Sequence, residues 1–533
     1  MSPALLATRG VFRHGDDVEV EVRGDVAGPL TVYHLGDVVA EHEVAAGAAT
    51  VSLGPLPPGG FGVEIALGDA VVRTAVQVSG TPRRCLRYGF VADYRPDRDV
   101  GEVVEHARRL HLTAVQCYDW AYRHADLLGG GDRYDDPLGN AVSLATVRRL
   151  VEGLGGAGVA TLGYAAVYGV GAAEWPRWGH LALQQADGTP YTLGDFLSLV
   201  DPAAPEWLDH FVDDLARAAA SVGFDGFHLD QYGYPRRAVR HDGTRVDVAA
   251  SFVSVIEAAR AGLPTSRLVF NNVNDFPTWR TAPLAQDAVY IEAWPPHVTL
   301  GSLAAMVTRA RTLAGDTPVV VAAYQHVYRE TTAACADLAA AFTMATLFSH
   351  GATHLLAGED GRVLVEPYYV DNHAAERSTQ DLLVRWYDFL VEHDELLIDP
   401  ALVDVTGAWA GPYNDALDVT YGDVDVADEP RPGCVWRRVV ALPGENAGLV
   451  VHLVNLVGQD DSLWDAPRRP VGASGTGRLR IRRVGPVLPR VRAADPDRAG
   501  RLVDVPVRSD GAFAVAELPA PHVWQVVLVE PSP

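Results

Sequence analysis

Basic residues are few in this sequence, and their scarcity argues against binding partners that carry many negative charges. The 533 residues include 44 Lys and Arg against 68 Asp and Glu, which gives a net charge of −24. Nucleic acids and anionic membrane surfaces are bound through clustered Lys and Arg, so we expect neither as a partner. No apolar run reaches the roughly 18 residues that a membrane span needs. Hydrophobic residues make up 48% of the chain, a globular balance that fits an enzyme acting on a neutral substrate.

Cysteine is also sparse. Cys85, Cys117, Cys335 and Cys434 lie far apart, with no C-x-x-C pair and no Cys/His spacing typical of a zinc site. We therefore expect reduced thiols, no metal and no organic cofactor. The opening segment lacks a basic stretch followed by a long apolar one, so it predicts no signal peptide. The compartment stays open between the cytoplasm and, with a leader removed, secretion.

The sequence predicts three structural parts. Residues 1–82 alternate apolar and polar positions between Gly, Pro and Asp turns, which indicates a β-sandwich. Residues 83–394 alternate short apolar runs with helical periodicity, which indicates a central (β/α)8 TIM barrel. A doubly wound sheet is the alternative, but the Gly-rich loop that usually follows its first strand is missing. Residues 395–533 return to strand periodicity and indicate a second β-domain. The eight barrel strands are expected at 87–94, 113–120, 161–168, 226–231, 268–273, 288–294, 318–324 and 353–359.

Polar and aromatic residues gather where these predicted strands end. Active sites of TIM barrels lie at the carboxyl ends of the strands, so side chains from different strands should meet there. Aromatic rings stack on sugar rings, amides and carboxylates bind hydroxyls, and a pair of carboxylates can cleave a glycosidic bond. The sequence therefore predicts a sugar site. Its candidate catalytic residues are Asp230 and Glu292, and its candidate substrate-binding residues are Tyr94, Tyr118, Asp119, Trp120, His228, Asn272, Trp294 and Tyr324.

Asp230 and Glu292 are the best candidates for the carboxylate pair. Asp230 ends the apolar run 226–230, and the Gln-Tyr-Gly-Tyr-Pro that follows is no helix start, which disfavours a capping role. Glu292 ends a similar run. The Trp-Pro-Pro at 294–296 would form an apolar wall that raises a carboxyl pKa, as suits a general acid. Asp275 is the alternative acid.

Several segments in order between residues 84 and 375 together resemble glycoside hydrolase family 66. That family contains endo-dextranases and cycloisomaltooligosaccharide glucanotransferases. The specific matches are YDWAYRHADL (118–127) and FDGFHLDQYG (224–233), joined by VYIEAWP (289–295) and HLLAGEDGRVLVEPYYVDN (354–372). The resemblance implies an immunoglobulin-like N-terminal domain and an antiparallel Greek-key C-terminal domain around the barrel.

The resemblance also implies a reaction, the retaining cleavage of α-1,6-linked glucan. Asp230 would be the nucleophile and Glu292 the general acid/base, with Asp119, His228 and Trp294 contacting the substrate. We expect hydrolysis of dextran or isomalto-oligosaccharides by double displacement, with the two carboxyl groups about 5 to 6 Å apart. Transglycosylation on the same substrates and a non-catalytic carbohydrate-binding protein are the alternatives.

Some features of the family are not visible in the sequence. It shows no secretion signal, no extra carbohydrate-binding module and no long barrel insertion typical of cyclising members, so cyclisation is less expected. The sequence leaves endo or exo action and chain-length preference open. We expect a monomer or a small homo-oligomer.

Overall fold

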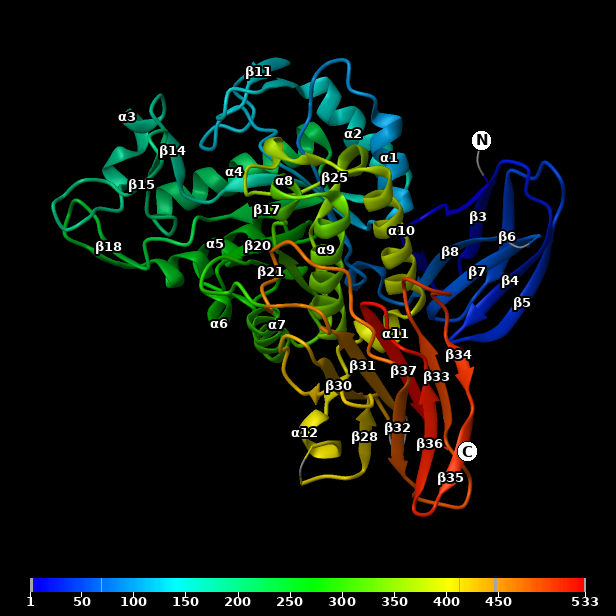
Figure 1. Cartoon of the computed structure of the whole chain (residues 1–533). Coiled ribbons are helices and arrows are strands. Elements are labelled where there is room, and N and C mark those ends of the chain that lie inside the picture. Colours follow the sequence, from blue (N-terminus) through cyan, green and yellow to red (C-terminus); the bar gives the residue numbers. More distant parts are fainter. Residues whose placement is uncertain (1–2, 69, 412, 445–447, 532–533) are drawn as a thin grey trace.

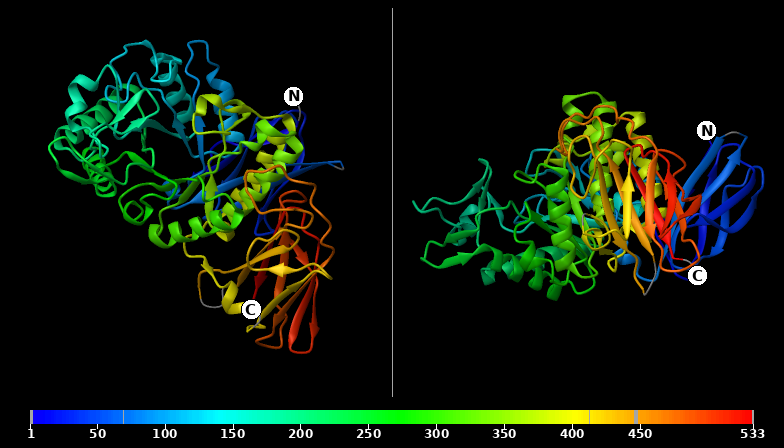
Figure 2. Two further views of the ribbon diagram at one scale, coloured as in Figure 1. Left: turned by 60° about the vertical axis from the view of Figure 1, so that its left-hand side comes forward. Right: turned by 60° about the horizontal axis from the view of Figure 1, so that its bottom comes forward.

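The computed structural model describes residues 3–531 except 69, 412 and 445–447. Along the chain it forms an N-terminal β-domain, a central barrel with its helices, and a C-terminal β-domain (Figure 1). The two β-domains lie on the same side of the barrel in all ribbon views, and a smaller lobe projects from the opposite side (Figure 2). Within the described ranges, no helix is both long and apolar enough for a membrane span.

The central sheet is a nearly closed barrel of eight parallel strands. Neighbouring strands follow the order β23-β22-β21-β20-β17-β13-β10-β9. At the remaining seam the Thr353 hydroxyl donates to the Leu86 carbonyl oxygen at 3.0 Å. The predicted barrel is therefore confirmed as a parallel eight-stranded barrel flanked by antiparallel sheets. Its strands are β9 (Tyr88–Val91), β10 (Ala114–Cys117), β13 (Ala160–Ala166), β17 (Gly226–Asp230), β20 (Arg267–Val273), β21 (Ala288–Glu292), β22 (Val319–Ala322) and β23 (Ala352–His354).

Amphipathic helices connect and cover these strands. Asp99 accepts from the backbone N–H of Gly101 and caps the first of them, and Gly223 ends another with a left-handed φ of 92° that a side chain would strain. The main helices are α1 (Val100–Arg109), α2 (Leu144–Gly156), α4 (Pro205–Val222), α5 (Val248–Gly262), α7 (Leu300–Ala314), α9 (Ala333–Ser349) and α10 (Arg377–Glu392).

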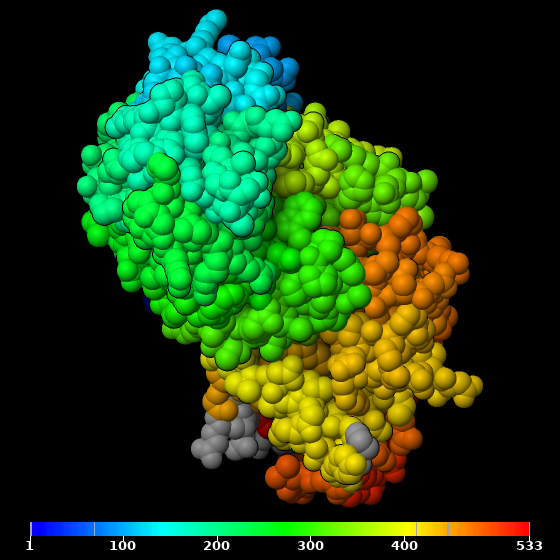
Figure 3. Space-filling view, turned by 90° about the vertical axis from the view of Figure 1, so that its left-hand side faces the viewer, coloured from blue at the N-terminus to red at the C-terminus, as the bar shows by residue number. Residues whose placement is uncertain are grey.

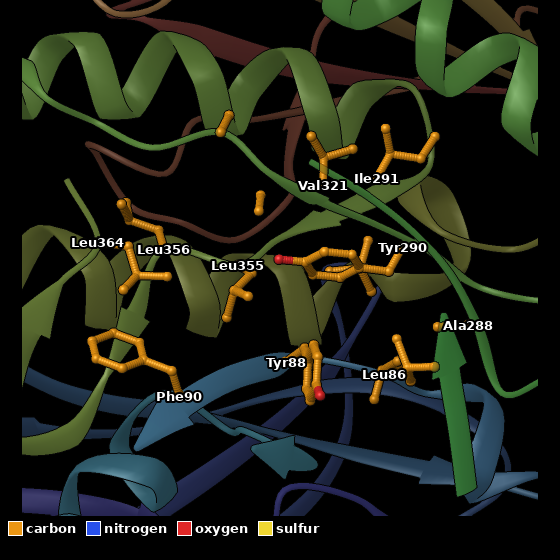
Figure 4. Close-up of a cluster of buried hydrophobic side chains, with 14 of the residues drawn as sticks. Leu86, Tyr88, Phe90, Ala288, Tyr290, Ile291, Val321, Leu355, Leu356 and Leu364 are labelled. Atoms are coloured by element: carbon orange, nitrogen blue, oxygen red, sulfur yellow. The ribbon is translucent and has the colours of Figure 1, made fainter. Parts of the chain in front are cut away.

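The barrel interior is filled by inward-pointing side chains. Figure 4 shows Tyr88 and Tyr290 meeting in this interior, with Leu86 and Leu355 nearby. The rings of Tyr88 and Tyr290 lie edge to face at 6.2 Å, and the Tyr88 hydroxyl lies 3.2 Å from Nδ1 of His228. This layer fills the barrel interior beneath the carboxyl ends of the strands. It therefore forms the floor of a pocket at those ends.

Two excursions build the projecting lobe. One leaves the barrel after β13, and the other leaves it after the neighbouring strand β17. Their strands pair locally as β14-β16-β15 and β18-β19. These short strands lie outside the eight predicted runs. They are β14 (Gly169–Gly171), β15 (Thr192–Leu193), β16 (Leu197–Leu199), β18 (Arg237–Val239) and β19 (Arg245–Asp247).

The N-terminal domain packs a three-stranded sheet against a five-stranded one. Alternate residues of β3 such as Val18 and Val20 are fully buried between the sheets, as the alternating sequence pattern predicts. The sheets are β1 (Ala4–Ala7), β3 (Asp17–Arg23) and β6 (Thr50–Pro55), then β2 (Phe12–Arg13), β8 (Ala70–Ser79), β7 (Gly59–Leu67), β4 (Gly28–His34) and β5 (Asp37–Val44).

The C-terminal domain also has two facing sheets, with a separate apolar core that includes Val439, Val451 and Leu479. One sheet contains β27 (Val403–Asp404), β29 (Val426–Ala427), β30 (Val435–Ala441), β31 (Leu449–Asn455), β37 (Trp524–Glu530), β33 (Arg490–Ala494) and β34 (Val503–Val505). The other contains β28 (Leu417–Thr420), β32 (Gly477–Arg482), β36 (Phe513–Leu518) and β35 (Val507–Asp510).

The helix α10 joins both β-domains to the barrel. On one side Glu392, which is fully buried, pairs with Arg73 of β8. On the other side the rings of Trp386 and Phe389 pack against Trp524 of β37 at 5.8 and 5.3 Å. Helix α10 therefore makes a polar contact with the N-terminal domain and an aromatic contact with the C-terminal domain.

Candidate active site

A pocket of about 380 Å³ opens at the carboxyl ends of the barrel strands. Figure 3 shows the molecule hollowed on this side, between the teal and green lobe and the yellow-green segments of the barrel. The lobe supplies one wall of the pocket through Leu193, Phe196 and Leu197. The remaining lining is Gln116, Tyr118, Asp119, His124, Leu138, Tyr164, His228, Asp230, Gln231, Tyr232, Gly233, Arg236, Asn271, Val273, Asn274, Tyr290, Glu292, Trp294, Tyr324, Pro367, Tyr368 and Tyr369.

Asp230 and Glu292 face each other across this pocket. Asp230 is the last residue of β17 and Glu292 the last of β21, with β20 between the two strands. Asn271 of β20 donates from Nδ2 to Oδ1 of Asp230 at 2.7 Å and to Oε2 of Glu292 at 3.1 Å. Because one nitrogen reaches both oxygens, these oxygens cannot be more than about 5.8 Å apart. This upper bound includes the spacing of about 5 to 5.5 Å found between the carboxyl groups of retaining glycosidases.

Two tyrosines each add a hydrogen bond to the pair. The Tyr164 hydroxyl donates to Oδ2 of Asp230, and the Tyr324 hydroxyl donates to Oε1 of Glu292, both at 2.7 Å. Each carboxylate thus accepts from its own tyrosine, and both accept from Asn271. Such donors stabilise the ionised form of a carboxyl group and fix the direction in which its free lone pairs point.

Burial raises the pKa of both carboxyl groups. The pKa of Asp230 rises to about 7, first because the group is desolvated and then because Glu292 lies close by. Desolvation also raises the pKa of Glu292, against the donors Tyr324, Asn271 and Trp294 that lower it. Ionisation of both carboxyl groups together is therefore unfavourable in this place.

Asp119 and His228 are further polar groups of the pocket. Asp119 is buried, its pKa is raised well above its usual range by desolvation, and its Oδ1 has no partner among the described residues. Its φ of 42° is a left-handed conformation that Asp tolerates better than most residues. Burial lowers the pKa of His228 to about 3, so this ring is neutral and can both donate and accept.

Aromatic side chains surround these polar groups. Tyr118 stacks on Tyr369 with ring centroids 4.5 Å apart, and Trp294 meets Tyr324 edge to face at 5.8 Å. Tyr368 is 37% exposed at the rim. The structure thus brings seven of the ten predicted residues into one pocket: Tyr118, Asp119, His228, Asp230, Glu292, Trp294 and Tyr324.

Tyr94, Trp120 and Asn272, three of the predicted residues, are not among the residues that line the pocket. The Tyr94 hydroxyl donates to the carbonyl oxygens of Val91 and Tyr118, at 2.8 and 2.9 Å. The Trp120 indole donates to the Tyr164 carbonyl oxygen at 3.2 Å, and the ring is fully buried.

Asn272 points away from the pocket because successive residues of a strand face opposite sides. Its Nδ2 donates to the Tyr290 carbonyl oxygen at 2.9 Å, and its Oδ1 accepts from the Thr281 hydroxyl at 2.5 Å. Asn271 is the asparagine that faces inward. The alternative acid Asp275 pairs with Arg309 and also lies outside the lining.

The pocket also contains residues that the ends of the predicted strands did not indicate. Tyr368 and Tyr369 come from the segment after strand β25 (Arg362–Val363), and Phe196 comes from the lobe. The two tyrosines lie in the matching segment 354–372, which was a usable signal. Phe196 carries no comparable signal in the sequence. No cluster of three or more His, Cys, Asp or Glu side chains suited to a metal ion occurs among the residues with described positions.

Comparisons with known proteins give three findings. The sequence pattern of the family described as Glycosyl hydrolase family 66 matches residues 10–528. Two cycloisomaltooligosaccharide glucanotransferases from Niallia circulans are similar. One is 20% identical over 620 residues, 86% of this chain and 63% of that relative. The other is 23% identical over 288 residues, 48% of this chain and 29% of that relative. The chain thus spans less than two thirds of either relative.

Among solved structures, a Paenibacillus cycloisomaltooligosaccharide glucanotransferase complexed with cycloisomaltoheptaose superimposes with a TM-score of 0.86. It is 19% identical, and the match covers 98% of this chain and 99% of that one. A maltogenic α-amylase from Thermotoga neapolitana reaches a TM-score of 0.54 at 9% identity, covering 85% of this chain and all of that one. These likenesses show a shared fold.

Proposed function

The chain belongs to glycosyl hydrolase family 66, and from this premise we propose that it is a retaining enzyme of α-1,6-linked glucose oligosaccharides that transfers the glycosyl group to a sugar acceptor. The observation that carries the proposal is the bridge of Asn271 between Asp230 and Glu292, which holds their nearest oxygens within about 5.8 Å. Retaining enzymes need the shorter carboxylate separation because one carboxylate attacks the sugar directly.

Asp230 is the proposed nucleophile. Its oxygens accept two short hydrogen bonds, from Tyr164 and Asn271, and these donors favour its ionised form against the burial and the nearby Glu292 that raise its pKa to about 7. In the first step Asp230 attacks the anomeric carbon, and the bond from that carbon to the glycosidic oxygen breaks. The product is a covalent glycosyl-enzyme.

Glu292 is the proposed general acid/base. It is the more enclosed of the two groups, with only 7% exposed, and burial favours its protonated form. It gives its proton to the departing glycosidic oxygen. In the second step it takes a proton from the incoming hydroxyl, which attacks the anomeric carbon and releases Asp230.

The lining of the pocket supports a neutral sugar as substrate. Among its described residues only Arg236 carries a permanent positive charge, so a phosphorylated substrate would find little compensation. Asp119 and the neutral His228 offer hydrogen bonds to hydroxyl groups at the floor. Tyr118, Trp294 and Tyr368 offer ring faces on which pyranose rings can stack.

Transfer is favoured over hydrolysis, the outcome that the sequence placed first. The similar Niallia circulans proteins are named glucanotransferases, and the similar Paenibacillus structure holds a cyclic isomalto-oligosaccharide. The pocket is also lined by the aromatic side chains of Phe196, Trp294 and Tyr368. A second sugar stacked on these rings would occupy the place from which water could attack, and this supports transfer. We take the acceptor to be a separate sugar.

The test uses isomaltotetraose with and without added isomaltose. Chromatography should show products longer than the substrate, with a ratio of transfer to hydrolysis that rises with acceptor concentration. Early products should have the α configuration by NMR, and D230N should form none of them. β-Anomeric first products would overturn retention, and short products alone would return the assignment to hydrolysis. Binding of the sugar without turnover would mark the chain as a carbohydrate-binding protein.

A further inference from the structure

A loop of the C-terminal β-domain lies against the barrel beside the active site. It comprises residues 458–472 between β31 and β32, and we call it the strap. Its ends meet where Gly472 N–H donates to the Val457 carbonyl oxygen at 2.8 Å. Gln459 donates from Nε2 to the Arg469 carbonyl oxygen at 2.9 Å. The strap is thus a closed, internally braced loop of the Ω type. In Figure 1 it is the orange loop that rises from β31 past α9 and β21.

The strap binds the segment that follows Glu292. Leu300 N–H donates to the Ser462 carbonyl oxygen at 2.8 Å, and Trp464 N–H donates to the Val298 carbonyl oxygen at 3.1 Å. These bonds form an antiparallel bridge between the strap and the connection from β21 to α7. The Trp464 indole adds a 2.7 Å hydrogen bond to the His297 carbonyl oxygen. Trp464 is only 6% exposed and belongs to the apolar core of the barrel.

The strap also binds the segment that follows Tyr324. Oδ1 of Asp465 accepts from the backbone N–H of Val327 at 2.9 Å. Val327 is the first residue of the short helix α8 (Val327–Glu330). The N–H groups at the start of a helix have no acceptor within the helix. Asp465 therefore satisfies a donor that would otherwise be left free, three residues after Tyr324.

These two segments carry the side chains that hold Glu292. Tyr324 donates to Glu292 at 2.7 Å, and Trp294, whose side chain lowers the pKa of Glu292, meets the Tyr324 ring with centroids 5.8 Å apart. The hydrogen bonds of the described residues tie the strap to the segments after β21 and β22, and none ties it to the segment after β17, which carries Asp230. Further bonds tie the strap to helix α9, from Arg468 N–H to the Cys335 carbonyl oxygen at 3.3 Å and from the Thr343 hydroxyl to the Trp464 carbonyl oxygen at 3.4 Å. Among the pocket-forming segments that the structure describes, the strap is therefore hydrogen-bonded on the acid/base side and not on the Asp230 side.

We propose that Trp464 and Asp465 are positioning residues for the acid/base Glu292, supplied to the barrel by the C-terminal domain. This inference rests on the proposed function of Glu292. The strap fixes the backbone on which Trp294 and Tyr324 stand, and so keeps the Glu292 proton aimed at the glycosidic oxygen. A displacement of about 1 Å is enough to cost a large factor in rate.

The kinetic test compares two leaving groups in the variants W464F and D465A. An unactivated isomalto-oligosaccharide needs a proton on its leaving oxygen, whereas α-isomaltosyl fluoride releases an anion. We expect kcat/KM to fall about 10-fold for the oligosaccharide and less than about 2-fold for the fluoride, since general acid help is lost only from the first. D465N, whose side-chain oxygen can still accept from Val327, should recover most of the loss. D460A alters an exposed acid of the strap whose one ion-pair partner among the described residues is Arg469, also in the strap, and it should match the wild type.

Hydrogen–deuterium exchange supplies a readout that needs no activity. In W464F and D465A, peptides covering 293–300 and 324–330 should exchange faster, while those covering 226–236 stay unchanged. Unchanged exchange in the first two segments would overturn the inference, and so would equal loss on both substrates. If the wild type cleaved neither substrate, the proposed function would fall, and exchange alone would decide whether the strap holds these segments.

Discussion

The Tyr324 hydroxyl donates a 2.7 Å hydrogen bond to Oε1 of Glu292, and both side chains are buried. A donor of this kind stabilises the ionised carboxylate and lowers its pKa, against the burial that raises it. Tyr324 therefore makes the Glu292 carboxyl group give up its proton more readily than burial alone would allow.

Replacement of this tyrosine should shift the pH dependence of the reaction. In Y324F the ionised form of Glu292 loses a donor, so the pKa of Glu292 rises. The alkaline limb of the kcat/KM profile, where the acid form is lost, should move up by about one pH unit. Y328F removes a hydroxyl that binds Asp337 outside the pocket lining, and its profile should match the wild type. A Y324F profile that does not move would show that Glu292 does not set this limb.

The neighbouring residues Asn271 and Asn272 should respond in opposite ways to replacement by alanine. N271A removes the donor shared by the two carboxylates, and we expect kcat to fall about 100-fold with little change in Tm. N272A removes the donor to the Tyr290 carbonyl oxygen and leaves the buried Thr281 hydroxyl only its longer bond to the Pro277 carbonyl oxygen, at 3.3 Å. It should lower the free energy of unfolding by about 1–3 kcal/mol and spare much of the activity. Kinetics and thermal melts of the two variants test this, and a reversed pattern would mean that Asn272 faces the substrate.

The predicted fold and site came from different signals in the sequence. Strand and helix periodicity gave the barrel, because burial of one face imposes that period on the residues. Strand ends gave Asp230 and Glu292, since both end apolar runs. The same reading could not separate Asn271 from Asn272, because the face of a strand depends on register that only the barrel fixes. It also could not place Phe196, which reaches the pocket from a lobe outside the eight strands.

Asp230 should make the protein less stable as the pH rises. Its pKa is about 7 in the folded protein against a usual 3.8, so the folded state holds this proton more tightly than the unfolded state. Its contribution to stability is therefore fully present below pH 4 and is lost as the pH rises to about 7.

Removal of the charge should reverse this loss. At about 1.4 kcal/mol per pKa unit, the raised pKa of Asp230 corresponds to at most about 4 kcal/mol in the free energy of unfolding. Asp230 is partly open to the pocket, which reduces this effect. We therefore expect D230N to raise the free energy of unfolding by about 2 kcal/mol at pH 8. Denaturant melts at pH 4 and pH 8 measure the gain, which should vanish at pH 4. The exposed D460N should show no gain at either pH. A gain of equal size at both pH values would point to a cause other than the charge.

Arg73 should be important for stability although it lies far from the pocket. It pairs with Glu392 of α10, a carboxylate with no exposed surface. R73M leaves this buried carboxylate without its cation, and we expect a loss of about 3 kcal/mol in the free energy of unfolding. The exposed pair of Arg508 and Glu517 offers a matched control, since R508M should cost less than about 1 kcal/mol. Equal melting curves for the two variants would show that the buried pair contributes nothing net.

Under the proposed function, the lobe after β13 and β17 contacts the sugar chain while the barrel strands carry the reacting groups. Leu193 and Leu197, on strands β15 and β16, and Phe196, in the turn between them, reach the pocket from outside the barrel sheet. Asp230, Asn271 and Glu292 stand on the barrel strands themselves. Loops that are not part of a shared core accept insertions and replacements far more readily than core strands do. The length and shape of the bound saccharide can therefore diverge between descendants of this fold while the reacting groups stay in place.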